Sequence, residues 1–416
     1  MDDDQATRIL LVDNKASDHA RYLDDKLVQL LEGLGGQLDG TGYAPDDIAG
    51  MLDRLNAPAP DTRAPLPPSV ALADRFLVPP FSVLDARQGY WQDRKNRWDS
   101  VGLRSGAGRA RGLVYGGART YGLAEADPVT ALIASKGRGS RKAGPAGHGD
   151  PVTDQIADMT GGTSLFDPVL AEVLLAWLSK PGARIIDPFA GGSVRGVVSS
   201  LLGRQYTGVD LSDDQCQANR EQALELCAGA SLLGGVCPTP QWHVGDSRDI
   251  TATWPAADGL FDMLLTCPPY FDLEVYSDDP RDLSRATGGV DGFTQALAAC
   301  LTPAVARMHD DRFAAIVMGE ARDRNGDLDG LVPATIEAAR QAGLRYYNEA
   351  ILVTPVGTNA IRAARPFMAT RKIVRGHQTV LIFVRGSAAR AAQWLGPVDV
   401  ADIPTGPAQG FLPEAP

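Results

Sequence analysis

The feature that most constrains the fold is a regular alternation of strand-like and helix-like segments, which begins near residue 160 and continues to about residue 386. Short runs rich in β-branched and aromatic residues, such as RIID, QYTGVD and VLIFVR, are separated by longer segments with apolar residues at helical spacing. Strands that alternate with helices favour an α/β fold, in which helices cover both faces of a doubly wound, mostly parallel sheet. The last two runs, 344–355 and 378–386, predict an antiparallel hairpin at one edge of that sheet.

The remaining segments differ from this domain in composition. We expect five parts: a small, mainly helical segment at 1–56, a Pro-rich linker at 57–72, a basic region rich in aromatic residues and glycine at 73–159, the α/β domain at 160–390, and a tail at 391–416.

An acidic residue ends each of three successive strand-like runs: Asp187 follows RII, Asp210 follows YTGV, and Asp246 follows HVG. The carboxyl ends of parallel strands form the edge at which open α/β sheets bind ligands. A single acid there is more often a turn or cap residue, but three in succession indicate a binding edge. Asp210 could accept two ribose hydroxyls, and Asp246 could hold an adenine amino group. The glycines of DPFAGGSVRG would let the backbone approach the ligand, and the GxGxxG pattern of dinucleotide-binding turns is absent.

In this order and spacing, DPFAGGSVRG, YTGVDLS, VGDSRD and TCPPY resemble the S-adenosylmethionine-dependent DNA methyltransferases. The resemblance covers roughly residues 160–386 and implies a Rossmann-like methyltransferase fold, S-adenosyl-L-methionine as cofactor and double-stranded DNA as partner. TGGTSLFDPVLAEVLLAWL resembles the element that wraps the methionine end of the cofactor. The cofactor residues that this resemblance implies are Thr163, Ser164, Phe166, Asp167, Asp187, Phe189, Ala190, Gly191, Gly192, Ser193, Asp210, Leu211, Asp246 and Ser247.

Residues 8–55 are similar to the end of a ParB-like domain that is often fused to phage and bacterial methylases. The nuclease-like front of that domain is missing, so we expect this segment to pack or bind rather than to cut nucleic acid.

The stretch TCPPY gives the candidate catalytic residues. DNA methyltransferases that act on exocyclic amino groups have Asp, Asn or Ser at this position, followed by Pro-Pro and an aromatic residue. In this chain Pro268 and Pro269 would fix a rigid turn, and Tyr270 would stack on a base flipped out of the duplex. The first position is instead Cys267, and a thiol is a poor hydrogen-bond acceptor. Methylation of cytosine carbon 5, however, requires a thiolate that adds to carbon 6.

A carboxylate on the next strand supports the interpretation that the chain methylates cytosine. Glu320 ends the next strand-like run, with Arg322 two residues later, and could protonate cytosine nitrogen 3. The cytosine-5 enzymes pair a Cys with such a Glu, although their Cys follows the prolines. One alternative is the formation of N4-methylcytosine or N6-methyladenine through the CPPY loop, with Cys267 standing in for Ser. A second is an RNA or nucleotide methyltransferase. A third is a non-catalytic DNA-binding or partition-type protein.

Positive charge is concentrated away from these motifs. The stretch 86–147 contains twelve Lys or Arg and four Asp or Glu, a balance of +8 in a chain whose net charge is −11. We expect DNA contacts here, where Arg and aromatic residues alternate, although a solvated insertion has the same composition. The expected contacts, including three before the last strand, are Arg87, Arg94, Lys95, Arg97, Arg104, Arg109, Arg111, Arg371, Lys372 and His377.

The five cysteines show no CxxC or metal-ligand spacing, so we expect free or buried thiols in a reducing cytoplasm and no metal site. No apolar run approaches the ~20 residues that span a bilayer, and the acidic N-terminus is unlike a signal peptide.

Overall fold

The computed structural model describes residues 68–104, 166–232, 237–250, 259–271, 277, 279–323, 325–355 and 359–398. The predicted segment 1–56 and most of the basic region lie outside the described residues. The candidate site residues that also lie outside them are Thr163, Ser164, Arg109 and Arg111.

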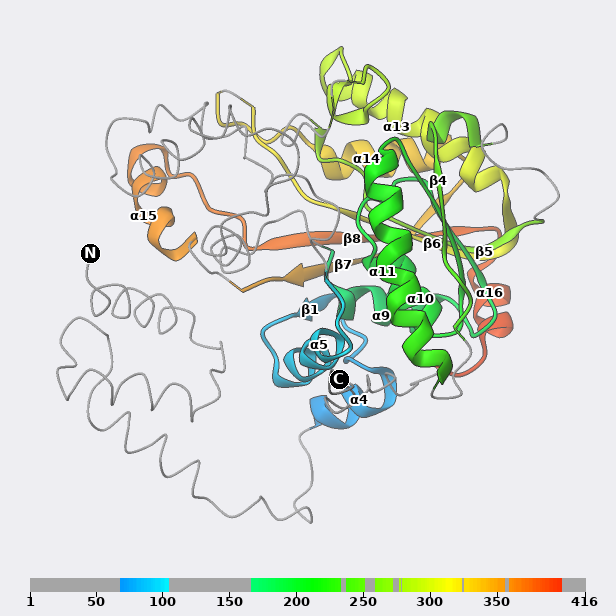
Figure 1. Cartoon of the computed structure of the whole chain (residues 1–416). Helices are drawn as coiled ribbons and strands as arrows, with labels where there is room; N and C mark the ends of the chain where they lie inside the picture. Colours follow the sequence, from blue (N-terminus) through cyan, green and yellow to red (C-terminus); the bar gives the residue numbers. More distant parts are fainter. Residues whose placement is uncertain are drawn as a thin grey trace, which may run out of the picture.

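In the described residues, one sheet has the strand order β1-β7-β8-β6-β5-β2-β3-β4 (Figure 1). Its strands are β1 Val83–Asp85, β2 Arg184–Asp187, β3 Gln205–Asp210, β4 Gln241–Val244, β5 Phe261–Thr266, β6 Met308–Met318, β7 Arg345–Val353 and β8 His377–Arg385. β8 runs antiparallel to β6 and β7, and the other pairs are parallel. The predicted doubly wound sheet with an antiparallel pair on one side is therefore confirmed.

Helices cover both faces, and the alternation of side chains along the strands explains why. In β8, Val380 and Ile382 belong to the core under α5, α9, α10, α11 and α16, whereas Leu381 and Phe383 belong to the core under α13 and α14. The helices are α4 Pro68–Phe76, α5 Gly89–Ser100, α9 Pro168–Leu178, α10 Val194–Leu201, α11 Asp213–Leu232, α13 Gly289–Ala306, α14 Leu331–Gln341, α15 Asn359–Thr370 and α16 Ala388–Leu395.

The ends of the domain differ from the prediction. β1 and α5 come from the region expected to contact DNA, yet β1 pairs in parallel with β7 and so extends the sheet beyond the antiparallel pair. α5 packs on α9 through two fully buried indoles: Trp98 Nε1 donates to Glu172 Oε2 (3.0 Å), and Trp91 Nε1 donates to Asp167 Oδ2 (3.3 Å). Trp91 and Trp98, two aromatic residues of this region, are therefore part of the core and not of a surface that could contact DNA. α4 begins inside the predicted linker, and α16 extends into the predicted tail.

The order of the strands fixes where a ligand can bind. From β2 the chain continues to β3 and β4 on one side, whereas β5 and β6 lie on the other side, so the direction of winding reverses between β2 and β5. Ligands of open α/β sheets bind outside the carboxyl ends of the strands at such a switch point. Asp187 and Thr266 end the two strands that flank it.

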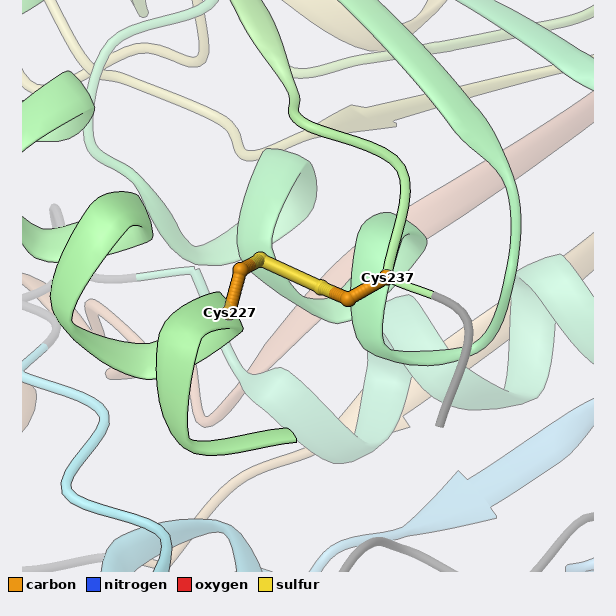
Figure 2. The surroundings of a disulfide bond; sticks show 2 residues. All are labelled: Cys227 and Cys237. Atoms are coloured by element: carbon orange, nitrogen blue, oxygen red, sulfur yellow. A yellow bond between two sulfur atoms is a disulfide. The ribbon is translucent and has the colours of Figure 1, made fainter. Parts of the chain in front are cut away.

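A disulfide joins Cys227, in α11, to Cys237, in the segment that leads to β4 (Figure 2). The expectation of free or buried thiols is thus wrong for this pair, whose Cα atoms lie 5.6 Å apart. The other cysteines, Cys216, Cys267 and Cys300, do not form a disulfide.

Two functional classes receive no support from the described residues. None of the helices there combines the length and apolar character needed to cross a membrane. Within the same ranges, no three His, Cys, Asp or Glu side chains are grouped so that they could hold a metal ion.

The disulfide gives the first testable prediction. It closes a loop with a sequence separation of 10, so Cys227→Ser should lower the free energy of unfolding by about 2 to 3 kcal/mol. Denaturant unfolding with and without reductant measures this change. Reductant should destabilise the unsubstituted protein and leave the Cys227→Ser variant unchanged, whereas alkylation of all five cysteines in the oxidised, denatured protein would show that the bond does not form.

Candidate functional site

Asp187 is the centre of the site. It is fully buried at the end of β2, and groups from three neighbouring elements donate hydrogen bonds to its carboxylate. Oδ2 accepts from Arg195 Nε in α10 (2.7 Å) and from Tyr206 Oη in β3 (2.8 Å), and Oδ1 accepts from Thr266 Oγ1 in β5 (2.6 Å). These bonds, with a fourth from the N–H of Phe189 (3.1 Å), satisfy the buried charge. Asp187 therefore organises the loop that follows it.

That loop, the 188–193 turn, is held from two sides. On one side, Arg195 Nη2 donates to the carbonyl oxygens of Phe189 (2.7 Å) and Ala190 (3.0 Å). On the other side, the Asn219 amide in α11 donates to the carbonyl oxygen of Gly191 (2.7 Å). Gly191 has φ +49°, a conformation that favours glycine. The turn thus has a fixed shape beside the switch point.

Two further hydroxyls secure the turn. Ser193 Oγ donates to Gln222 Oε1 in α11 (2.5 Å), and Ser247 Oγ donates to the carbonyl oxygen of Pro188. Both serines are buried, and their hydroxyl groups stabilise the turn through these hydrogen bonds. Three other predicted cofactor residues, Phe189, Gly192 and Leu211, are half-buried along it, whereas Ala190 is buried.

Asp210 meets the turn from the end of β3. Its Oδ2 accepts from the N–H of Gly191 (2.8 Å), and its Oδ1 accepts from the N–H of Ser212 (2.9 Å). Burial raises the pKa of Asp210, and the two N–H groups oppose this rise. Each carboxylate oxygen can accept more than one hydrogen bond. The half-buried Asp210 therefore fits the ribose of a cofactor that lies across the ends of β2 and β3.

Asp246 follows β4 and is held by Arg248, whose Nη2 lies 2.7 Å from Asp246 Oδ2. Burial would raise the pKa of Asp246, but the hydrogen bonds from Arg248 lower it. This carboxylate is therefore ionised at neutral pH, at the rim next to Asp210.

The residues before β2 have structural partners. Asp167 caps α9 by accepting from the N–H groups of Val169 (2.8 Å) and Leu170 (3.2 Å). The Phe166 ring lies under the Arg195 guanidinium, 4.7 Å from Cζ to the ring centroid. Phe166 and the 188–193 turn thus contact the same guanidinium group.

The CPPY loop leaves β5 beside this turn. Pro268 is buried, whereas Cys267 and Pro269 are partly exposed. Tyr270 is only 9% exposed, and its ring packs so closely on Gly319 that a Cβ there would lie 2.7 Å from a ring carbon. The Tyr270 hydroxyl accepts from Gln378 Nε2 (2.8 Å) and lies 3.8 Å from Cys267 Sγ. The ring is therefore tied to β8 and to Gly319, directly after β6, and Cys267 and Pro269 are the partly accessible residues of the loop.

Glu320, at the end of β6, is occupied. Its Oε2 accepts from the N–H groups of Gly330 (3.0 Å) and Leu331 (3.1 Å), and its Oε1 accepts from the N–H of Val332 (2.8 Å). These are free N–H groups at the start of α14, so Glu320 acts as a cap for that helix. Arg322 Nη1 donates to the carbonyl oxygen of Gly326 (2.7 Å) within the following loop.

Some of the residues expected to contact DNA form ion pairs within the protein. Arg94 is paired with the buried Glu172, Arg87 with Asp85, and Arg104 with Glu225 on the surface. Burial and the charge of Arg375 lower the pKa of His377, so its imidazole is neutral at pH 7. Of the other expected contacts, Arg97 and Arg371 are exposed, and Lys95 and Lys372 are partly exposed.

Sequence reasoning missed the groups that hold the site together. Arg195 was read only as part of a glycine turn, yet it is 5% exposed and binds Asp187 and two carbonyl oxygens. Asn219 and Gln222 were hidden in a polar helix, but their spacing of three places them on one face of α11. Buried polar residues at that spacing were the available signal.

Comparisons with known proteins were made by sequence and by structure. No protein-family model matches the chain, and no curated protein sequence matches it. Among solved structures, TrmN from Thermus thermophilus is 19% identical with a TM-score of 0.33, and the match covers 53% of this chain and 49% of that one. The chain thus spans about half the length of TrmN.

Two further structures match with similar scores. Magnesium protoporphyrin IX methyltransferase from Synechocystis PCC 6803, with bound SAH, is 13% identical over 61% of this chain and 94% of that one, with a TM-score of 0.35. Geranyl diphosphate methyltransferase in complex with SAM is 16% identical over 57% and 93%, with a TM-score of 0.36. Similarity at this level carries no argument about activity, so the functional argument depends on the site.

The hydrogen bonds of Arg195 predict an effect on cofactor binding. Arg195→Lys keeps the charge but cannot reach Asp187 and both carbonyl oxygens at once, so the affinity for S-adenosylhomocysteine should fall about tenfold or more. Titration calorimetry measures it. Arg390→Lys, which changes an exposed pair with Asp311 at the opposite end of β6, is the control and should bind normally. Unchanged affinity in Arg195→Lys would contradict the proposed role of the arginine.

The hydrogen bonds of Glu320 predict an effect on stability. Glu320→Ala removes the acceptor for three N–H groups and should lower the free energy of unfolding by about 1 to 2 kcal/mol. Glu337→Ala, at an exposed position of the same helix, should change it much less. If Glu320→Ala instead keeps its stability and loses methyl transfer, Glu320 is a catalytic acid.

Proposed function

We propose that this protein is an S-adenosylmethionine-dependent methyltransferase that modifies a base in double-stranded DNA, preferably cytosine. One observation carries the proposal. Three carboxylates at the ends of the adjacent strands β2, β3 and β4 (Asp187, Asp210 and Asp246) share a rim with Cys267, which follows β5 on the other side of the switch point. A cofactor and a reactive group can therefore meet at the place where such sheets bind ligands.

The chain offers a consistent set of cofactor contacts. The 188–193 turn would face the methionine part, with Phe166 nearby. Asp210 would accept the ribose hydroxyls, and the ionised Asp246 would hold the adenine amino group. S-adenosylmethionine, once bound, supplies an electrophilic methyl group on its sulfonium sulfur.

Cys267 would provide the nucleophile. Its thiolate adds to carbon 6 of cytosine, forming a carbon–sulfur bond and making carbon 5 electron-rich. After carbon 5 has gained the methyl group, it loses its proton to water, and the carbon–sulfur bond breaks to release the thiolate. One observation supports this role: Cys267 is partly exposed directly after β5, at the rim that the three carboxylates share.

The hydrogen bonds of Glu320 favour a second candidate reaction, methylation of an exocyclic amino group. Its carboxylate already accepts three backbone N–H bonds, so protonation of cytosine nitrogen 3 by this group would disrupt the cap of α14. Methylation of an exocyclic amino group, giving N4-methylcytosine or N6-methyladenine, needs no thiolate and no such acid. In that reaction the rigid Pro268–Pro269 turn would direct the carbonyl groups of the loop toward the amino group.

The proposal predicts the modified nucleoside and a covalent complex. DNA treated with the protein and cofactor should yield 5-methylcytosine on digestion and mass spectrometry. DNA that carries 5-fluorocytosine should trap the unsubstituted protein, because the fluorine blocks release of the thiolate, and should not trap Cys267→Ser. N4-methylcytosine or N6-methyladenine would replace the thiolate mechanism by the second chemistry. Absence of any methylated nucleoside, with no binding of S-adenosylhomocysteine, would refute the methyltransferase proposal.

A further inference from the structure

The segment between β7 and β8 presents an unusual surface at the same rim. β7 ends where β8 begins, with Val353 paired to His377, so α15 and the residues after it connect the two strands at the cofactor edge of the sheet. Figure 1 shows α15, in orange, standing away from the sheet beyond the ends of β7 and β8. We call the exposed part of this connection the α15 rim patch; its members are Phe367, Met368, Arg371, Lys372 and Ile373.

The patch combines large apolar side chains with positive charge. Phe367, Met368 and Ile373 are 45%, 70% and 73% exposed. The Arg371 guanidinium lies over the first two, with Cζ 5.4 Å from the Phe367 ring centroid and Nη1 3.5 Å from Met368 Sδ. Arg371 also has φ +60°, the left-handed conformation that commonly ends a helix, and its N–H donates to the carbonyl oxygen of Phe367 (2.8 Å).

The surroundings of the patch select an anionic partner. The segment 359–378 contains five Arg or Lys and no Asp or Glu, in a chain whose net charge is −11. Such a local reversal of charge attracts phosphates and repels basic protein surfaces. Exposed apolar side chains beside arginine are also the means by which proteins open base steps in duplex DNA.

The patch is linked directly to the candidate catalytic loop. Gln378 donates to the Tyr270 hydroxyl (2.8 Å), and the five residues of backbone from Ile373 to Gln378 span at most about 18 Å. Arg375, between them, is close enough to Glu320 and Tyr270 that both raise its pKa, although burial lowers it overall. A duplex seated on the patch would therefore lie beside the rim that must receive a flipped base.

We propose that the α15 rim patch is a duplex-opening wedge. Phe367 and Met368 enter the base stack of double-stranded DNA, while Arg371 and Lys372 contact the flanking phosphates. This inference rests on the proposed function, because a base must leave the duplex before it can reach Cys267. It assigns DNA opening to the connection between β7 and β8, whereas α5 of the N-terminal basic region packs into the core.

The test measures binding of fluorescent probes by anisotropy. The full-length protein is titrated against a short DNA duplex of mixed sequence, the same duplex with a central mismatch, and duplex RNA of that sequence. The double variant Phe367→Ala/Met368→Ala should bind the matched DNA about tenfold more weakly but the mismatched DNA nearly normally, because a mismatch removes much of the unstacking cost. Leu224→Ala, which shortens a 63%-exposed side chain on α11, is the control and should bind both probes normally.

A second variant separates charge from insertion. Arg371→Ala should reduce the slope of log affinity against log salt by about 1 and weaken binding to both DNA probes equally. Equal binding of matched DNA by the double variant and the unsubstituted protein would overturn the wedge, as would an equal loss on both probes. Tighter binding to duplex RNA, or to phosphatidylglycerol vesicles, than to DNA would overturn the choice of partner.

The outcome for the wedge is distinguishable from that for the proposed function. Wedge-dependent DNA binding without binding of S-adenosylhomocysteine would support the wedge and refute the methyltransferase. Methylation of DNA with binding that is insensitive to the double variant would refute the wedge alone.

Discussion

The structure depends on the buried carboxylate of Asp187. A buried charge is tolerated only when it is paired and fully hydrogen-bonded, and removal of one partner of such a pair typically costs about 3 to 5 kcal/mol. Arg195, Tyr206 and Thr266 meet this requirement from α10, β3 and β5, which are the elements around the switch point of the sheet. The same interaction that stabilises the core therefore also shapes the turn at which a cofactor would bind. Function and stability share this interaction, so few changes to it would be neutral.

The three acids at the strand ends have different tasks in this arrangement. Asp187 is inaccessible and acts through the turn that it supports, whereas Asp210 and Asp246 are at the rim with partly exposed carboxylates. A cofactor that lies across the rim would contact the last two directly and the first through Arg195 and the backbone. The CPPY loop completes the rim on the other side of the switch point, with Cys267 accessible and Tyr270 held by Gln378.

Much of this arrangement follows from local sequence. The strands from β2 to β8 are mostly apolar runs that alternate with helical segments, and acids at the ends of several of them identify the binding edge, so the sheet and its rim could be predicted. The contribution of β1 could not, because three residues in an irregular stretch gain their conformation from pairing with β7. Glu320 illustrates the limit for the site. Its place at a strand end suggested a catalytic acid, but the turn into α14 brings three N–H groups to it, and a one-dimensional pattern does not contain that geometry.

The central claim is that a methyl donor lies across the ends of β2 and β3, with its sulfonium pointing toward the loop after β5. A crystal structure of the protein with S-adenosylhomocysteine tests it most directly. The account predicts electron density along the 188–193 turn, with the ribose hydroxyls on Asp210 and the sulfur directed toward Cys267. Density at any other place on the protein, with the rim covered by the chain itself, would contradict it.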